Sequence, residues 1–121
     1  MAELASGVVV LRNDADFRGY CMLVLRRHRV ELFDLPAGER RDFIEDASRL
    51  ARAIQECCGP AKLNYAMLGN EVPHLHLHII PRYPDDGWWG RSPWARPDAQ
   101  RRLLAPDGFE RLASPLRNAL R

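Results

Sequence analysis

Cysteine is scarce in this sequence, whose 121 residues include three, at positions 21, 57 and 58, with no CxxC pair. An odd number of cysteines without paired spacing excludes the disulfide framework of a small secreted protein and favours a reducing compartment. Residues 1–7 lack the charged-then-apolar pattern of a secretory signal, and no apolar run approaches the roughly 20 residues that a membrane-spanning helix needs. We therefore expect a cytoplasmic protein with no membrane attachment.

An excess of charge of one sign is also lacking, since 18 basic residues face 16 acidic ones and leave a formal net charge of +2. So small an excess argues against a protein that wraps nucleic acid or binds an anionic membrane surface. The sequence has no internal repeat, low-complexity tract or convincing linker, and 46% of its residues are hydrophobic. This length and composition fit one domain over residues 1–121, large enough to fold without disulfides or a structural metal.

Four short apolar runs have the length and composition of β-strands. Residues 8–11 and 20–25 are separated by a segment rich in turn-forming residues, which predicts a β-hairpin. Residues 63–68 and 75–80 are joined by the tight connection 69–73, so we expect them to pair as antiparallel neighbours.

The hydrophobic period changes between the two pairs of strands. Apolar residues over 43–58 recur three and four positions apart, which is typical of an amphipathic helix whose apolar face lies on a sheet. Asp34 is expected to cap the start of this helix. Gly59 and Pro60 are expected to end it, because glycine accepts a left-handed turn and proline cannot continue a helix.

A second helix is expected over residues 106–120, with a kink or a new turn at Pro115. Together these elements predict an α+β fold, in which a twisted antiparallel sheet of about five strands carries the long helix across one face.

Three of the four histidines, His74, His76 and His78, stand at alternate positions. Alternate side chains of a strand share one face, so the imidazoles would form a row with about 6.7 Å of rise between neighbours. Leu75 and Leu77 would enter the core on the other side. A polar sheet face without chemistry is the simplest interpretation, but packing alone seldom requires three histidines in such a row.

A metal site is a second interpretation of this row. Neutral imidazole is a common zinc ligand, and a strand can present two ligands in an HxH arrangement. The metal would need a further ligand, and the neighbouring sequence supplies only Glu71, Asp85 and Asp86, with no cysteine. A metal-dependent hydrolase with the triad as ligands therefore remains an alternative.

Nucleophilic catalysis at phosphorus is the interpretation that we favour. One imidazole attacks while its partners orient it and handle charge on the phosphate and the leaving group, so one difficult displacement becomes two easier ones. Histidine suits this role because it is substantially neutral near pH 7 and forms a phosphoramidate that water can cleave. No metal or other cofactor is then obligatory.

The run over residues 74–80, HLHLHII, resembles the HxHxHxx signature of the histidine triad (HIT) family. Residues 63–82 also look like the strand, turn and strand of bacterial HIT proteins. Residues 26–36 are similar to the segment that carries the family's fourth histidine and leads into its helix. The resemblance covers about residues 8–94, and it implies a HIT-like fold and a symmetric homodimer.

By this resemblance, His76 would be the catalytic nucleophile that takes a nucleoside monophosphate from the substrate. His74 would orient the nucleophile, His78 would contact the phosphate or the leaving group, and His28 would line the same pocket. The implied substrates are dinucleoside polyphosphates, nucleoside phosphoramidates or related nucleotide conjugates.

The resemblance also implies residues that bind substrate. The family holds the ribose with an acidic or amide side chain at the end of an early strand, a position that Asn13 or Asp14 could fill, although both also suit a turn. Asn70 resembles a family asparagine or glutamine that contacts phosphate. Glu71 stands where other branches carry serine or threonine, and its carboxylate would repel phosphate or act as an acid for the leaving group.

The zinc ligands of some HIT branches are missing, so we expect no structural metal. Trp88, Trp89 and Trp94 follow the triad and either form part of the pocket or pack at the sheet or a dimer interface. A nucleotide-binding regulator that kept the pocket but lost turnover is the remaining alternative to an enzyme.

Overall fold

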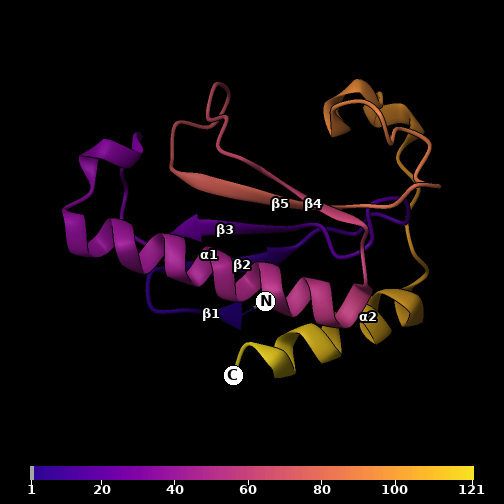
Figure 1. Cartoon of the computed structure of the whole chain (residues 1–121), viewed down its shortest axis with the longest axis horizontal. Helices are drawn as coiled ribbons and strands as arrows, with labels where there is room; N and C mark the ends of the chain where they lie inside the picture. The colour runs from indigo at the N-terminus through magenta and orange to yellow at the C-terminus, as the bar shows by residue number, and fades with distance from the viewer. Residues whose placement is uncertain (1) are drawn as a thin grey trace.

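The computed structural model describes residues 2–121, which form five strands and two helices (Figure 1). The strands are β1 (Ala2–Glu3), β2 (Gly7–Leu11), β3 (Cys21–Leu25), β4 (Lys62–Ala66) and β5 (His76–Arg82), and the helices are α1 (Ala37–Cys58) and α2 (Pro106–Ala119). Short 3-10 turns are η1 (Leu32–Asp34), η2 (Pro93–Ala95) and η3 (Asp98–Gln100). Over this described range, neither helix has the length and apolar character to cross a membrane.

The strands form one antiparallel sheet in the order β1-β2-β3-β5-β4, which confirms the predicted α+β architecture. β2 and β3 make the expected hairpin, and β4 pairs with β5 as predicted. The triad strand β5 thus lies inside the sheet, between β3 and β4. The fifth strand, β1, was not located from the sequence, because two residues carry no recognisable period.

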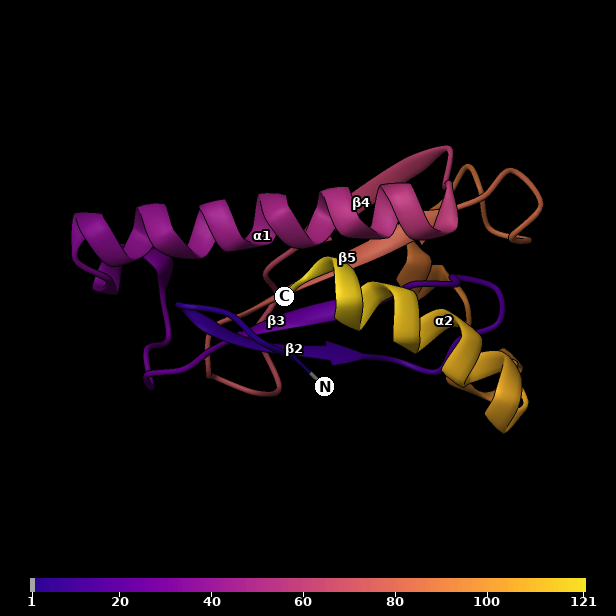
Figure 2. The ribbon, with the colours of Figure 1, turned by 90° about the horizontal axis from the view of Figure 1, so that it is seen from below.

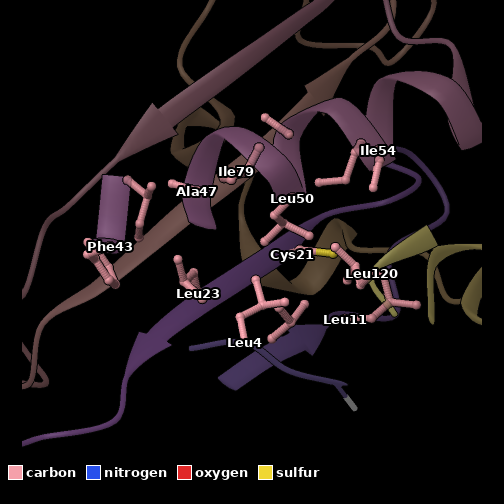
Figure 3. Packing of buried hydrophobic residues seen from close by; sticks show 14 of the residues in the cluster. Leu4, Leu11, Cys21, Leu23, Phe43, Ala47, Leu50, Ile54, Ile79 and Leu120 are labelled. Atoms are coloured by element: carbon pink, nitrogen blue, oxygen red, sulfur yellow. The ribbon is translucent and has the colours of Figure 1, made fainter. Parts of the chain in front are cut away.

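Helix α1 lies across one face of the sheet, with α2 beside it (Figures 1 and 2). Its buried residues follow the predicted spacing of three and four, and they meet the odd-numbered residues of β2, β3 and β5. The core between these layers includes Leu4, Leu11, Cys21, Leu23, Phe43, Ala47, Leu50, Ile54, Ile79 and Leu120 (Figure 3). Removal of this apolar surface from water is the main force that holds helix and sheet together.

Helix α1 ends as predicted but begins differently. Gly59 has a left-handed φ of 63°, and its N–H donates to the carbonyl of Gln55, which satisfies one of the last helical acceptors. The prediction that Asp34 caps α1 is wrong. Its carboxylate instead accepts the N–H of Glu31 at 3.0 Å within η1, and Pro36 occupies the N-cap position of α1.

Helix α2 is continuous from Pro106 to Ala119 with Pro115 inside it, so the helix neither ends nor restarts at Pro115. Its residues Ala113 and Leu116, and Leu120 at its C-cap, join the same core as α1. The guanidinium of Arg49 on α1 donates to the carbonyl of Leu120 at 2.7 Å and fixes the end of the chain. Both helices therefore support one face of the sheet, and the other face is left for the even-numbered side chains of the strands.

Candidate active site

His76 and His78 project from the open face of β5, opposite Val24 and Met22 of β3 in the register. Their ring centroids lie 4.9 Å apart, and the rings meet edge to face. His74 precedes the first residue of β5 and lies in a bend, so the predicted row on one strand holds for two of the three histidines. The bend turns the ring of His74 towards His28.

Hydrogen bonds determine which nitrogens of His74 and His28 carry protons. Nε2 of His74 lies 2.6 Å from the carbonyl oxygen of Leu25, which only accepts, so this nitrogen carries the proton. Nδ1 of a neutral His74 is then an acceptor, and it lies 3.1 Å from Nδ1 of His28. His28 then donates from Nδ1, which links its exposed ring to His74. His28 lines neither of the two cavities at the triad, and its predicted place in the pocket stays a prediction.

The ring of His76 is oriented by the main chain. Its Nδ1 lies 2.6 Å from the carbonyl oxygen of His74, so Nδ1 carries the proton and donates it. In the neutral ring Nε2 then has a free lone pair, and the His76 side chain lines a cavity on this face. This is the tautomer that a nucleophilic imidazole needs, because the attacking nitrogen is unprotonated.

His78 is held in its neutral form. Burial, with contributions from the neighbouring charges of His76 and Arg12, lowers the pKa of His78 to about 4. Its Nδ1 lies 2.8 Å from the hydroxyl of Tyr20, whose own pKa is raised, first of all by burial. Tyr20 was not singled out from the sequence, although its alternation with Met22 on the adjoining strand places it on the same face as the triad.

The cavity over these rings has a volume of about 500 Å³. Its wall combines aromatic and apolar groups with a comparable number of polar and charged ones, which suits a ligand that has both an apolar and a charged part. The lining residues are Arg12, Phe17, Tyr20, Met22, Leu68, Gly69, Asn70, Glu71, Val72, His76, His78, Pro93, Trp94, Arg96 and Asp98. A smaller cavity of about 190 Å³ has His74 and His76 in its wall. A substrate held at His76 could thus extend into both.

Asn70 and Glu71 both line the larger cavity, in the loop between β4 and β5. This is where the sequence placed a contact to phosphate and a neighbouring carboxylate. Gly69, just before them, has a φ of 74°, which a side chain would strain, so it fixes the turn that presents the amide of Asn70.

The structure gives Asn13 and Asp14 contacts within the protein. The Asn13 amide donates to the Leu104 carbonyl and accepts the Leu104 N–H, which fastens the segment before α2 to the β2–β3 loop. Asp14 is fully buried; its carboxylate accepts backbone N–H groups at Asp16 and Phe17 and binds the Arg96 guanidinium through two nitrogens. Neither side chain lines the cavity, and their predicted contact to ribose stays a prediction.

The ion pair between Asp14 and Arg96 shifts the pKa of both side chains. Burial alone would raise the pKa of Asp14, but hydrogen bonds from Arg96 and from the Phe17 N–H outweigh it and hold this pKa below its usual value. The same hydrogen bond raises the pKa of Arg96. The pair joins residues 82 positions apart and so anchors the segment that carries Trp94.

The three tryptophans have different environments. The ring of Trp94 meets the ring of His78 edge to face, with centroids 5.2 Å apart, and it forms part of the cavity wall. Trp88 packs against the small buried cluster that contains Tyr20, and Trp89 is largely exposed. The sequence left open whether these tryptophans line the pocket or pack elsewhere. Trp94 lines the pocket, and Trp88 packs against the buried cluster.

Metal-donor side chains do not converge at the triad. Within residues 2–121, no group of three or more His, Cys, Asp or Glu side chains has the mutual geometry to hold a metal ion. His74 and His76 each have one ring nitrogen bonded to a main-chain carbonyl, and the nearby carboxylate of Glu71 completes no ligand set with them.

Comparison with known proteins gives a family match and close structural neighbours. The family model described as HIT domain matches residues 3–85. A histidine triad protein from Bradyrhizobium japonicum superposes with a TM-score of 0.91 at 33% identity, over 99% of this chain and 88% of that one.

Two curated relatives match shorter segments. An uncharacterized HIT-like protein of Methanocaldococcus jannaschii is 28% identical over 74 residues, or 58% of this chain and 57% of that protein. A bis(5'-adenosyl)-triphosphatase of Saccharomyces cerevisiae is 35% identical over 71 residues, or 54% of this chain and 34% of that protein. The aligned segments therefore span only about a third to somewhat over half of these relatives.

Proposed function

This chain belongs to the histidine triad family, and we propose that it cleaves a nucleotide substrate at phosphorus through a nucleotidyl intermediate on His76. The observation that carries the proposal is the hydrogen bond of 2.6 Å between Nδ1 of His76 and the His74 carbonyl. It fixes the proton on Nδ1 and leaves Nε2 as the nitrogen with a lone pair. The proposed reaction class is hydrolysis of a phosphoric anhydride or phosphoramidate bond, or transfer of the nucleotidyl group to another acceptor.

In the first step, Nε2 of His76 forms a bond to the α-phosphorus, and the bond from phosphorus to the leaving oxygen or nitrogen breaks. The leaving group keeps the electron pair. The ring of His76 becomes cationic because both of its nitrogens are now substituted, and the His74 carbonyl dipole stabilises that charge through the Nδ1–H bond. The dipole is already oriented before the reaction, so no reorganisation is needed as the charge develops.

His78 is proposed to donate to the phosphate. If the Tyr20 hydroxyl donates to Nδ1 of a neutral His78, the proton of that ring is on Nε2. That N–H then faces the cavity and can bond a phosphate oxygen without placing a full charge beside His76. The amide of Asn70, which lines the same cavity from the loop between β4 and β5, is proposed as a second donor to the phosphate.

In the second step, water attacks the phosphorus and the bond to Nε2 breaks. The electron pair returns to the ring and the nucleoside monophosphate leaves. The proton that the water gives up passes to the solvent, from which the leaving group of the first step takes up a proton. Splitting the displacement in this way returns His76 to its starting tautomer, with Nδ1 still bonded to the His74 carbonyl.

The substrate class that we propose is a dinucleoside polyphosphate, a nucleoside phosphoramidate or a related nucleotide conjugate. The name of the yeast relative, a bis(5'-adenosyl)-triphosphatase, supports a dinucleoside substrate. The larger cavity, with Tyr20, Met22 and Trp94 in its wall, suits a nucleoside better than the smaller one does. We also propose a homodimer, as in the family, and a cytoplasmic location, to which the free thiols of Cys21, Cys57 and Cys58 are suited.

The decisive experiment follows AMP release from diadenosine tetraphosphate and from adenosine phosphoramidate in excess chelator, by chromatography. We expect turnover by the wild type and a loss of at least about 10³-fold in His76→Ala, because the nucleophile is removed. Added imidazole should partly restore turnover to His76→Gly, which controls for misfolding. If His76→Ala were as active as the wild type, the assignment of His76 as nucleophile would be refuted. Loss of wild-type activity in the chelator would favour a metal-dependent hydrolase. Nucleotide binding without product would favour a nucleotide-binding regulator.

A further inference from the structure

The Arg12 guanidinium lies in the wall of the candidate active site, with its carbon 5.3 Å from the centre of the Tyr20 ring, and that contact satisfies none of its N–H donors. Among residues 2–121 its side chain makes no hydrogen bond or ion pair, and its Nε is buried with no partner. Arg96 lines the same cavity but is neutralised by Asp14 and Asp16. A buried donor without a partner is costly, so Arg12 is the polar group of this wall that most requires an external acceptor.

A second arginine stands close to Arg12 at the far end of the cavity. An open depression of about 400 Å³ is lined by Arg12, Asp98, Arg101 and Leu103, and it shares Arg12 and Asp98 with the larger cavity. Within the described chain Arg101 has no ion pair, and neither arginine lies within salt-bridge distance of Asp98. Two arginines against one aspartate leave this depression positively charged and open to an anion.

The sheet register fixes how far this depression lies from the nucleophile. Val10 pairs with Met22 and Met22 with His78, and the Arg12 N–H continues the pairing by donating to the Tyr20 carbonyl. Arg12 is thus two strands away from His76, about 10 Å across, and four residues, about 13 Å, along the sheet. Both side chains rise from the same face, so one nucleoside 5′-phosphate fits between them.

The direction of the reaction and the cavity wall together indicate which part of the substrate reaches Arg12. In an in-line displacement the leaving group departs on the side of the phosphorus opposite Nε2 of His76, so it and the nucleoside occupy different directions from the phosphorus. Arg12 lies along the sheet surface, at the end of the cavity lined by Tyr20 and Met22. We assign this end of the cavity to the nucleoside, because Tyr20 and Met22 supply the aromatic and apolar surface that a nucleoside packs against.

We propose that Arg12 and Arg101 form a second anion subsite, which binds a phosphate group on the 2′ or 3′ position of the ribose. This inference rests on the proposed function, since it assumes that the 5′ phosphorus lies at His76. Guanidinium suits the role because its planar fork can bond two phosphate oxygens at once. The Asp98 carboxylate, in the same wall, is available to a ribose hydroxyl that carries no phosphate.

The test is calorimetric titration of the protein with AMP, ADP, adenosine 2′,5′-bisphosphate and adenosine 3′,5′-bisphosphate. ADP adds the same kind of charge at the opposite end of the nucleoside, and the two bisphosphates distinguish the ribose positions. We expect one bisphosphate to bind at least about tenfold more tightly than AMP, as one charge-assisted hydrogen-bonded contact provides. The tight bisphosphate should lose most of its advantage when the salt concentration is raised, because the contact is ionic.

Variants assign the gain to the residues. The ratio compared is the dissociation constant of AMP divided by that of the tighter bisphosphate. In Arg12→Gln this ratio should fall below about threefold, and in Arg101→Gln it should fall partly. In Arg12→Lys it should be intermediate, because lysine keeps the charge but lacks the planar guanidinium that bonds two oxygens. Arg41→Gln is the matched control, since Arg41 is exposed on α1 behind the sheet, and its ratio should equal that of the wild type. Circular dichroism establishes that each variant is folded.

Two results would overturn the inference. They are a wild-type ratio near one for both bisphosphates, and a ratio that is unchanged in both Arg12 variants. If AMP binds and His76-dependent turnover is present in either case, the subsite fails while the proposed function stands. If no nucleotide binds at all, both fail.

Discussion

Replacement of Asp14 by asparagine should destabilise the protein strongly and misplace one wall of the candidate active site. The carboxylate is fully buried and accepts four hydrogen bonds, two from Arg96 and two from backbone N–H groups. The amide keeps the shape but removes the charge, so Arg96, itself buried, is left with Asp16 at 3.3 Å as its remaining acid.

The size of the effect follows from the burial of this pair. Breaking a buried ion pair by removing one partner costs about 3–5 kcal/mol, and Asp16 would reduce that loss, so we expect a loss of about 2–4 kcal/mol in the free energy of unfolding. For a chain of this length the melting temperature should fall by about 8–16 °C. The contribution of Asp14 is present above its unfolded pKa of 3.8 and is lost as the pH falls below it, because its folded pKa is lower.

Urea and thermal unfolding, followed by circular dichroism, give the free energy directly. A double-mutant cycle with Arg96→Gln should show that most of the loss is shared by the pair, and the exposed pair Arg111–Asp107 is the control, for which we expect under about 1 kcal/mol. A loss below about 1 kcal/mol in Asp14→Asn would refute the reasoning. If stability were normal and discrimination between ribonucleotides and deoxyribonucleotides were lost, the predicted ribose contact would replace the structural role.

Three further predictions concern single residues. The ring of His78 should titrate with a midpoint near pH 4 by nuclear magnetic resonance, and because the unfolded chain takes up this proton nearer pH 6.5, protein stability should fall as the pH drops from 6.5 towards 4; a midpoint above 6 would contradict its burial. Gly19→Ala should cost about 1–3 kcal/mol in thermal unfolding, since φ is +94° and the new Cβ would lie 2.8 Å from the Cys58 sulfur, whereas Gly38→Ala, with open space around it, should be neutral or stabilising. Glu71→Gln should raise kcat/KM by about two- to tenfold by removing a carboxylate near the phosphate, and a fall in kcat instead would show that Glu71 acts as an acid.

The regular elements could be predicted because their signals are local. The spacing of Phe43, Ala47, Leu50 and Ile54 predicted the long helix and its buried face, and short apolar runs bounded by turn-forming residues predicted four of the five strands. The start of α1 was missed because the turn η1 competes for the capping side chain, and propensity does not show which of two adjacent turns will take it.

The candidate site was predictable only in part. Alternation placed His76 and His78 on one face, but the ring of His74 is held by a hydrogen bond to the main-chain carbonyl of Leu25, which leaves no trace in residue type. The wall formed by Trp94 depends on a contact between Asp14 and Arg96, 82 residues apart. Local patterns carry no information about pairing at such a separation, and so Asp14 was predicted to contact ribose or form a turn, and its pairing with Arg96 was not predicted.

The hydrogen bond that sets the proton on His76 has a peptide carbonyl as its acceptor, and every amino acid supplies that group. A substitution at position 74 would remove an imidazole and its link to His28, but it would leave the acceptor in place. The tautomer of His76, the proposed nucleophile, is therefore protected against mutation in a way that its side-chain neighbours are not. Sequence changes around His76 can therefore alter its neighbouring side chains and the substrate that they bind, while Nε2 remains the nitrogen that carries the lone pair.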